Sequence, residues 1–146
     1  MEVTVLVTNG GPHPPDKWAA LTAKQIAALI QIDEQSDTAA AATARKAKPR
    51  LEIAISDAIE SSFTQIMSDE LALVNTGAIT ARNDPFQADQ YIDAALSGAV
   101  ATTVGTPFEV HFSDAAVQAI VRSIISQNIL DAANVQRSWA FDDKGL

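Results

Sequence analysis

Residues 113–139 decide the fold of this chain, and they read SDAAVQAIVRSIISQNILDAANVQRSW. Ser113 is a favourable N-cap residue, and Asp114 places a carboxylate at the positive end of the helix dipole. Apolar residues follow at steps of three and four, as on one face of a helix. They are Val117, Ile120, Val121, Ile124, Ile125, Ile129, Ala132 and Val135. The pattern predicts one long helix of roughly 37 Å, along which other elements must pack.

A second amphipathic helix is predicted over residues 51–74, because apolar residues recur there at the same spacing. This stripe consists of Leu51, Ile55, Ala58, Ile59, Phe63, Ile66, Met67, Leu71 and Val74. The alanine-rich run 39–44 favours a separate helix before it, with Pro49 as the end of that helix or a kink. The two long helices are expected to form the centre of the core.

Two shorter helices complete the predicted bundle. Thr22 and Gln25 have the spacing of a capping box, which marks the start of a short helix. Asp84 and Pro85 form a cap followed by a proline at the first helical position, and the helix that they begin is expected to end at Gly98.

Alternation of apolar and polar residues predicts two short strands. Their apolar faces consist of Val3, Val5 and Val7 in residues 2–8, and of Phe108, Val110 and Phe112 in residues 108–112. The two strands are candidates to pair with each other. Because two strands alone are marginal in water, we expect either that the helices cover them or that a strand of another subunit completes the sheet. The predicted fold class is mainly α: a helical bundle of three to four helices with a small two-stranded β element.

We predict a single, mainly helical domain over residues 1–138, in which residues 1–15 form a strand and a proline-rich arm. A C-terminal aromatic tail follows over residues 139–146. The chain of 146 residues has 47% hydrophobic residues, enough for one core. It has no run of about 18 apolar residues and no signal-peptide pattern, which favours a soluble protein.

Charge and composition disfavour several classes of function. The chain has 18 acidic and 10 basic residues, giving a formal net charge of −8. This balance disfavours a general binder of nucleic acids or anionic membranes. The lack of cysteine removes disulfides, thiolate catalysis and cysteine-ligated metal sites from consideration.

The remaining polar residues do not form a metal-binding pattern. His13 and His111 lack the clustered ligands of a metal site. Asp84, Asp89 and Asp93 are spaced at five and four residues, unlike the alternate-residue ligands of a calcium loop. We therefore predict no metal site.

Catalytic patterns are also missing from the sequence. No nucleophile elbow, P-loop or dinucleotide fingerprint occurs. The adjacent carboxylates Asp69 and Glu70 would point in different directions on a helix, so we interpret them as solvent-facing charges. We therefore predict no catalytic residue and no cofactor, and we expect that the protein is not an enzyme.

Proline and aromatic residues near the two ends of the chain are candidates for partner binding. Pro12, Pro14 and Pro15 form either a docking arm or, in the simpler interpretation, a stiff connector. Trp139 and Phe141 either fold back onto the core or anchor the tail in a groove of a neighbouring molecule.

A basic cluster is the third candidate. Arg45, Lys46, Lys48 and Arg50 supply four of the ten basic residues within six positions. They form either a phosphate-contacting patch or a set of cations that complements the dipole at the end of the alanine-rich helix. No aromatic side chain is interleaved to stack on bases, so the second interpretation is favoured.

These features favour a non-enzymatic structural or assembly protein that forms a homo-oligomer, for example a virion component such as a phage head-to-tail connector or neck subunit. The expected partners are other copies of the chain and neighbouring structural proteins, and not a membrane. The alternative is a small regulatory or packaging factor that contacts nucleic acid through the basic cluster, and this partner is less favoured.

Overall fold

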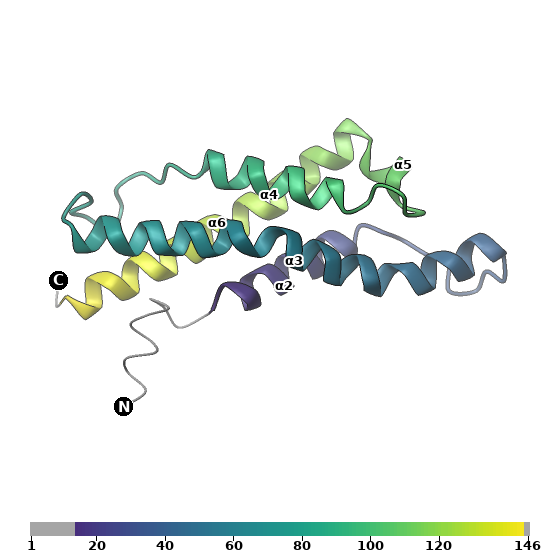
Figure 1. Ribbon diagram of the computed structural model, residues 1–146, viewed down its shortest axis with the longest axis horizontal. Helices are drawn as coiled ribbons and strands as arrows, with labels where there is room; N and C mark the ends of the chain where they lie inside the picture. Colours follow the sequence, from purple (N-terminus) through teal and green to yellow (C-terminus); the bar gives the residue numbers. More distant parts are fainter. Residues whose placement is uncertain (1–13, 145–146) are drawn as a thin grey trace, which may run out of the picture.

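The computed structural model describes residues 14–144, which form an elongated bundle of α-helices (Figure 1). Within this part of the chain the helices are α2 Pro15–Ala27, α3 Ala39–Asn75, α4 Asp89–Ala101, α5 Glu109–Phe112 and α6 Ala115–Asp143. Helix α3 runs along the molecule, with α2 on one side, α4 on the other and α6 crossing behind it (Figure 1). The prediction of a mainly helical bundle is confirmed.

Helix α6 is the predicted long helix, and it continues past Trp139 to Asp143. Its N-cap is Asp114 rather than Ser113, because Asp114 Oδ1 accepts a hydrogen bond from the backbone N–H of Ala116 at 2.7 Å. The face that packs against the rest of the bundle includes Val121, Ile125, Ile129, Ala132 and Ala133, all fully buried.

Helix α3 contains the predicted helix 51–74 but starts much earlier, at Ala39. We expected the alanine-rich helix to end or to kink at Pro49. Pro49 instead lies inside one continuous helix, so the alanine-rich run and the helix 51–74 are not separate. A proline at this position lacks the N–H that would bond the carbonyl of Arg45. The helix around Pro49 is largely exposed, so water can hydrogen-bond to that carbonyl. At the start of α3, Thr38 caps the helix, because its hydroxyl oxygen accepts a hydrogen bond from the backbone N–H of Ala41 at 3.1 Å.

The predicted two-stranded β element is wrong, because residues 14–144 contain no strand. Residues 109–112 form the single turn α5 instead. Phe108 and Phe112 are 5% and 1% exposed, and a separation of four residues places two side chains on one face of a helix as well as of a strand. Val110, midway between them, is 84% exposed, which fits the helix alone. The predicted strand 2–8 lies outside the described residues.

The two shorter helices also differ from their predicted starts. Thr22 lies inside α2, where its hydroxyl donates to the carbonyl of Trp18 at 2.8 Å instead of capping a helix. Helix α4 begins at Asp89 and not at Pro85. Asp84 does not cap it, since its Oδ2 accepts hydrogen bonds from the backbone N–H groups of Thr80 and Ala81.

Gly98 lies within α4 rather than at its end. A Cβ at this position would lie 3.3 Å from the carbonyl oxygen of Ala58 on α3, so the glycine allows the two helices to approach closely.

The main core lies between α2, α3, α4 and α6. Its largest fully buried side chains include Ile26, Ile55, Ile59, Phe63, Ile66, Ile125 and Ile129. A smaller cluster of Val74, Ala140 and Phe141 joins the C-terminal ends of α3 and α6. No helix in the described part of the chain has both the length and the apolar character needed to cross a membrane.

Candidate functional site

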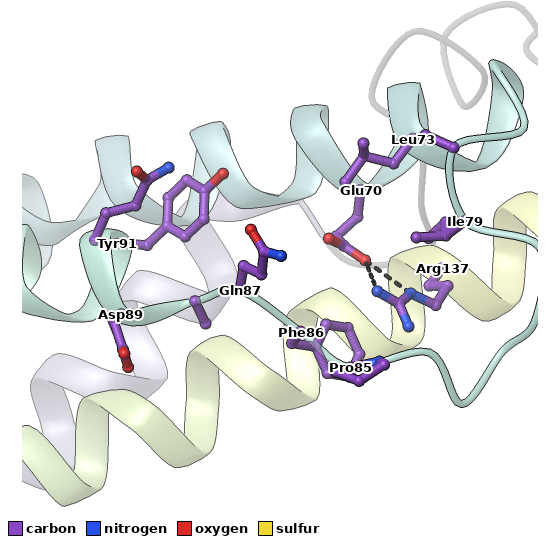
Figure 2. A pocket seen from close by; sticks show the side chains of 12 residues that line it. Glu70, Leu73, Ile79, Pro85, Phe86, Gln87, Asp89, Tyr91 and Arg137 are labelled. Atoms are coloured by element: carbon purple, nitrogen blue, oxygen red, sulfur yellow. Dashed lines mark hydrogen bonds and ion pairs between the residues drawn. The ribbon is translucent and has the colours of Figure 1, made fainter.

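A cavity of about 670 Å³ opens beside the α3–α4 linker, which we define as residues 76–88. Its walls come from α3, the linker, the first turn of α4 and one residue of α6 (Figure 2). The charged and aromatic side chains that could act on a ligand are those of Glu70, Phe86, Asp89, Tyr91 and Arg137.

The hydrogen-bonding groups of Arg137 are already engaged within the chain. Its Nε and Nη2 donate to Glu70 Oε1 at 2.8 and 2.7 Å (Figure 2). Nη1 donates to the linker carbonyls of Arg82, at 3.3 Å, and of Asp84. The guanidinium carbon lies 4.0 Å from the ring centroid of Phe86, a cation–π contact. Arg137 therefore holds the linker against α3 and α6.

Tyr91 on α4 is engaged in a similar way, because its hydroxyl donates to the carboxylate of Asp69 on α3. Burial and then the hydrogen bond to Asp69 raise the pKa of Tyr91 above its ordinary value. The phenol is therefore neutral at pH 7 and acts as a hydrogen-bond donor that joins two helices.

The expectation that Asp69 and Glu70 are solvent-facing is wrong for Glu70, whose side chain is 7% exposed, while Asp69 is half-buried. Sequence reasoning missed the residue that pairs with Glu70. A signal was present, because Arg137 continues the four-residue series of Val121, Ile125, Ile129 and Ala133 on the buried face of α6. A charged residue on such a face needs a buried partner.

A second arginine also ties the linker to α6. Arg82 donates to Asp142 Oδ1 at 2.6 Å and to the carbonyl of Ser138 at 3.0 Å, and its guanidinium lies over the ring of Phe141. Both side chains of this ion pair are largely solvent-accessible, so the pair contributes less to stability than the buried one.

The helix divides the basic cluster between two faces. Arg45 donates to the carbonyl of Ser36 at 3.1 Å, and Lys48 donates to the carbonyl of Ile30 at 2.9 Å. These two cations hold the α2–α3 loop against α3. Lys46 and Arg50 lie one turn apart on another face and line a separate groove of about 490 Å³.

We call this second hollow the basic groove. Its walls are one face of α3 and the turn after α4, formed by Thr43, Lys46, Ala47, Arg50, Leu51, Ala54, Thr102, Gly105, Thr106 and Pro107. The four clustered cations that the sequence groups together therefore do not act on one surface: two of them bind backbone carbonyls and two face the groove.

The predicted partner-binding residues are not gathered into one site. Pro12 lies outside the described residues, Pro14 is the N-cap of α2 and Pro15 is its first residue. Phe141 is 3% exposed and packs in the chain's own smaller cluster, whereas Trp139 is half-buried at the edge of that cluster.

The sequence did not identify the exposed apolar residues where α4 ends and α6 begins. Val104 and Val110, in the connection over residues 102–114, are 65% and 84% exposed, and Ile120 near the start of α6 is 50% exposed. The periodic pattern assigned Val110 and Ile120 to apolar faces and did not show that these faces lack cover.

His111 is exposed beside the ring of Phe112, and within residues 14–144 no three His, Cys, Asp or Glu residues are gathered as metal ligands would be. Comparisons of the chain with protein-family models, with curated proteins and with solved structures find no match. We therefore infer the function from the surfaces and contacts of this chain.

Proposed function

We propose that this chain is a non-enzymatic structural or assembly protein that forms a homo-oligomer. The observation that carries the proposal is the exposure of Val104 and Val110 at one end of the bundle. Val110 is uncovered although Phe112 on α5 and Phe108 just before it are buried, so this one-turn helix presents an apolar side chain to its surroundings.

Burial of these two valines alone would not offset the free-energy cost of association, so a larger contact surface is needed. Fully burying a valine side chain contributes about 1.5–3 kcal/mol. Association of two proteins costs about 4–15 kcal/mol in lost freedom of motion. The valines therefore favour association only as part of a wider interface that includes neighbouring side chains.

The cavity beside the α3–α4 linker also fits a structural role better than a chemical one. Its buried charges pair with each other, since Arg137 binds Glu70 and two linker carbonyls. Tyr91 binds Asp69, and the exposed Asp89 lies 3.9 Å from Arg122. An active site needs a base, nucleophile or electrophile directed at substrate. These groups are directed at the protein itself, where they hold the linker in place.

In its more specific form, the proposed function is that of a virion component such as a head-to-tail connector or neck subunit, with neighbouring structural proteins as further partners. Such a joint is built from several copies of a subunit and requires stable packing rather than catalysis. The self-association surface is the part of the proposal that a direct experiment tests first.

The experiment compares the wild type with a Val104→Asp/Val110→Asp variant by sedimentation equilibrium. We expect an oligomer for the wild type and a shift toward monomer for the variant, because a carboxylate in an apolar interface is costly. Leu21→Asp is the matched control, since Leu21 is also exposed, at 45%, but lies on α2. A wild type that is monomeric at every concentration overturns the proposal.

The nucleic-acid alternative makes a different prediction about the basic cluster. Arg45 and Lys48 donate to backbone carbonyls, which leaves Lys46 and Arg50 to contact phosphates. Two phosphate contacts would give a salt-dependence slope of about −2. A titration with duplex DNA at two salt concentrations measures this slope, and tight binding with a slope of this size would favour the alternative.

A further inference from the structure

Six of the ten cations of this acidic chain are engaged within it, and of the other four, Lys46 and Arg50 on α3 are neighbours. All ten lysine and arginine residues lie within residues 14–144. Six of them bind carboxylates or backbone carbonyls: Arg45, Lys48, Arg82, Arg122, Arg137 and Lys144. Lys46 and Arg50 make no such bond in the described part of the chain, and they lie one turn apart, where like charges repel.

The groove that these two cations line combines positive charge with an apolar floor. Leu51, Ala54 and Pro107 lie in the groove together with Lys46 and Arg50. The exposed Val104 belongs to the turn that forms one wall. An occupant must therefore bring carboxylate to the cations and an apolar side chain to the floor.

The C-terminal turn of α6 has this combination. Trp139 is half-buried and Asp143 is exposed, and their four-residue separation places them on one face of the helix. Within the described residues Asp143 has no hydrogen-bonding or ionic partner. The adjacent cation Lys144 donates to the carbonyls of Val74 and Asn75, so it does not neutralise Asp143.

A second exposed pair of this type fits less well. Ile53 and Asp57 on α3 also share a face, and Ile53 is 63% exposed. Lys24 from α2 lies in the same shallow hollow as both residues, and its ammonium group would repel Lys46 and Arg50.

We propose that the basic groove of one copy receives the C-terminal turn of α6 from a second copy, with Asp143 against Lys46 and Arg50 and Trp139 against the apolar floor. This inference rests on the proposed self-association and names the surfaces that carry it. The groove and the end of α6 lie toward opposite ends of the elongated molecule (Figure 1). Each copy therefore offers the groove toward one end and the turn of α6 toward the other, so the contact can close as an antiparallel dimer or repeat into a ring or a filament.

Charge reversal followed by rescue tests this contact. The groove variant Lys46→Glu/Arg50→Glu and the tail variant Asp143→Lys should each weaken association at least about tenfold, because like charges then face each other. The combined variant with all three substitutions should regain most of the association. Sedimentation velocity measures the three variants, and circular dichroism verifies that each remains helical.

The matched control is Lys17→Glu/Lys24→Glu, which changes the net charge by the same amount as the groove variant. Lys17 and Lys24 are exposed cations on α2, away from the groove. We expect this control to associate as the wild type does. Equal weakening by the control and the groove variant would mean that net charge alone governs association, which overturns the proposed contact.

The outcomes separate this inference from the proposed function. A wild-type monomer overturns both. An oligomer that the groove and tail variants leave unchanged, or that the combined variant fails to restore, overturns the contact between the groove and the turn of α6 and leaves the structural role intact. Tight duplex DNA binding that the groove variant abolishes overturns that contact in favour of a nucleic-acid partner.

Discussion

Arg137 and Glu70 form a buried ion pair between facing helices, in which two guanidinium nitrogens donate to one carboxylate oxygen at 2.8 and 2.7 Å. The remaining contacts of Arg137 go to linker carbonyls and to the ring of Phe86. One side chain thus joins α3, α6 and the linker between α3 and α4. Removal of that side chain should loosen the attachment of the linker to α3 and α6.

The substitution Arg137→Met should lower the free energy of unfolding by about 3–5 kcal/mol, because it leaves the Glu70 carboxylate buried without a partner. Adding Glu70→Leu should recover much of this loss by removing the unpaired charge. Chemical denaturation measures both changes. Arg82→Ala is the control at the exposed pair and should cost about 1 kcal/mol or less. Equal losses for Arg137→Met and Arg82→Ala would contradict the role of the buried pair.

Tyr91 should titrate above the ordinary tyrosine pKa. It is the only tyrosine in the chain, so the absorbance of phenolate reports this group alone. The hydrogen bond to Asp69 helps to raise its pKa, so Asp69→Asn should move the midpoint of the titration downward. A midpoint at or below the ordinary value of about 10 in the folded wild type would contradict the contact.

The raised pKa of Tyr91 also sets the direction of a stability change. The unfolded chain loses the phenol proton at lower pH than the folded chain does, so folding retains a proton. The stabilisation is fully present below the unfolded pKa and is lost as the pH rises through the folded pKa. The wild type should therefore lose stability relative to Tyr91→Phe over this alkaline range, as measured by urea denaturation at several pH values.

The periodic stripe on α6 predicted the helix correctly but not the burial of each residue on it. Ile120 and Ile125 both belong to the stripe, yet Ile120 is 50% exposed and Ile125 is fully buried. Apolar residues at three- and four-residue steps define one face of a helix. How much of that face is buried depends on how the neighbouring helices pack against it. The buried Arg137 was missed because spacing arguments considered only apolar residues.

Ile125→Ala should therefore lower stability by about 2–5 kcal/mol, the range for removal of a large aliphatic group from a core. Ile120→Ala should change it by about 0.5 kcal/mol or less, as at an exposed position. Thermal or chemical denaturation of the two variants gives this comparison directly. Similar losses at both positions would place the two residues in equivalent environments, contrary to the structure.

The β element could not be excluded from the sequence, because the pattern of Phe108 and Phe112 fits both a strand and a helical turn. Only the environment of Val110 distinguishes them, and that environment depends on the fold around α5. Pro49 shows the same dependence on context. A proline usually ends or kinks a helix, yet α3 continues through it. Local patterns fixed the two long helices, whereas tertiary contacts decided the short elements.

The two aromatic residues at the end of α6 should behave differently when replaced. Phe141 packs with Val74 and Ala140, so Phe141→Ala should lower stability by about 3–5 kcal/mol. Trp139 is half-buried at the edge of this cluster, so Trp139→Ala should cost less stability and should weaken association. Denaturation and sedimentation separate the two effects. Weakened association with Phe141→Ala at unchanged stability would reverse these assignments.

The measurement that tests the central claim most directly is sedimentation equilibrium of the unmodified chain over a wide range of concentrations. Self-association through the exposed end of the bundle predicts a mass above that of one chain, which rises with concentration. A mass that stays equal to one chain at every concentration would contradict the account.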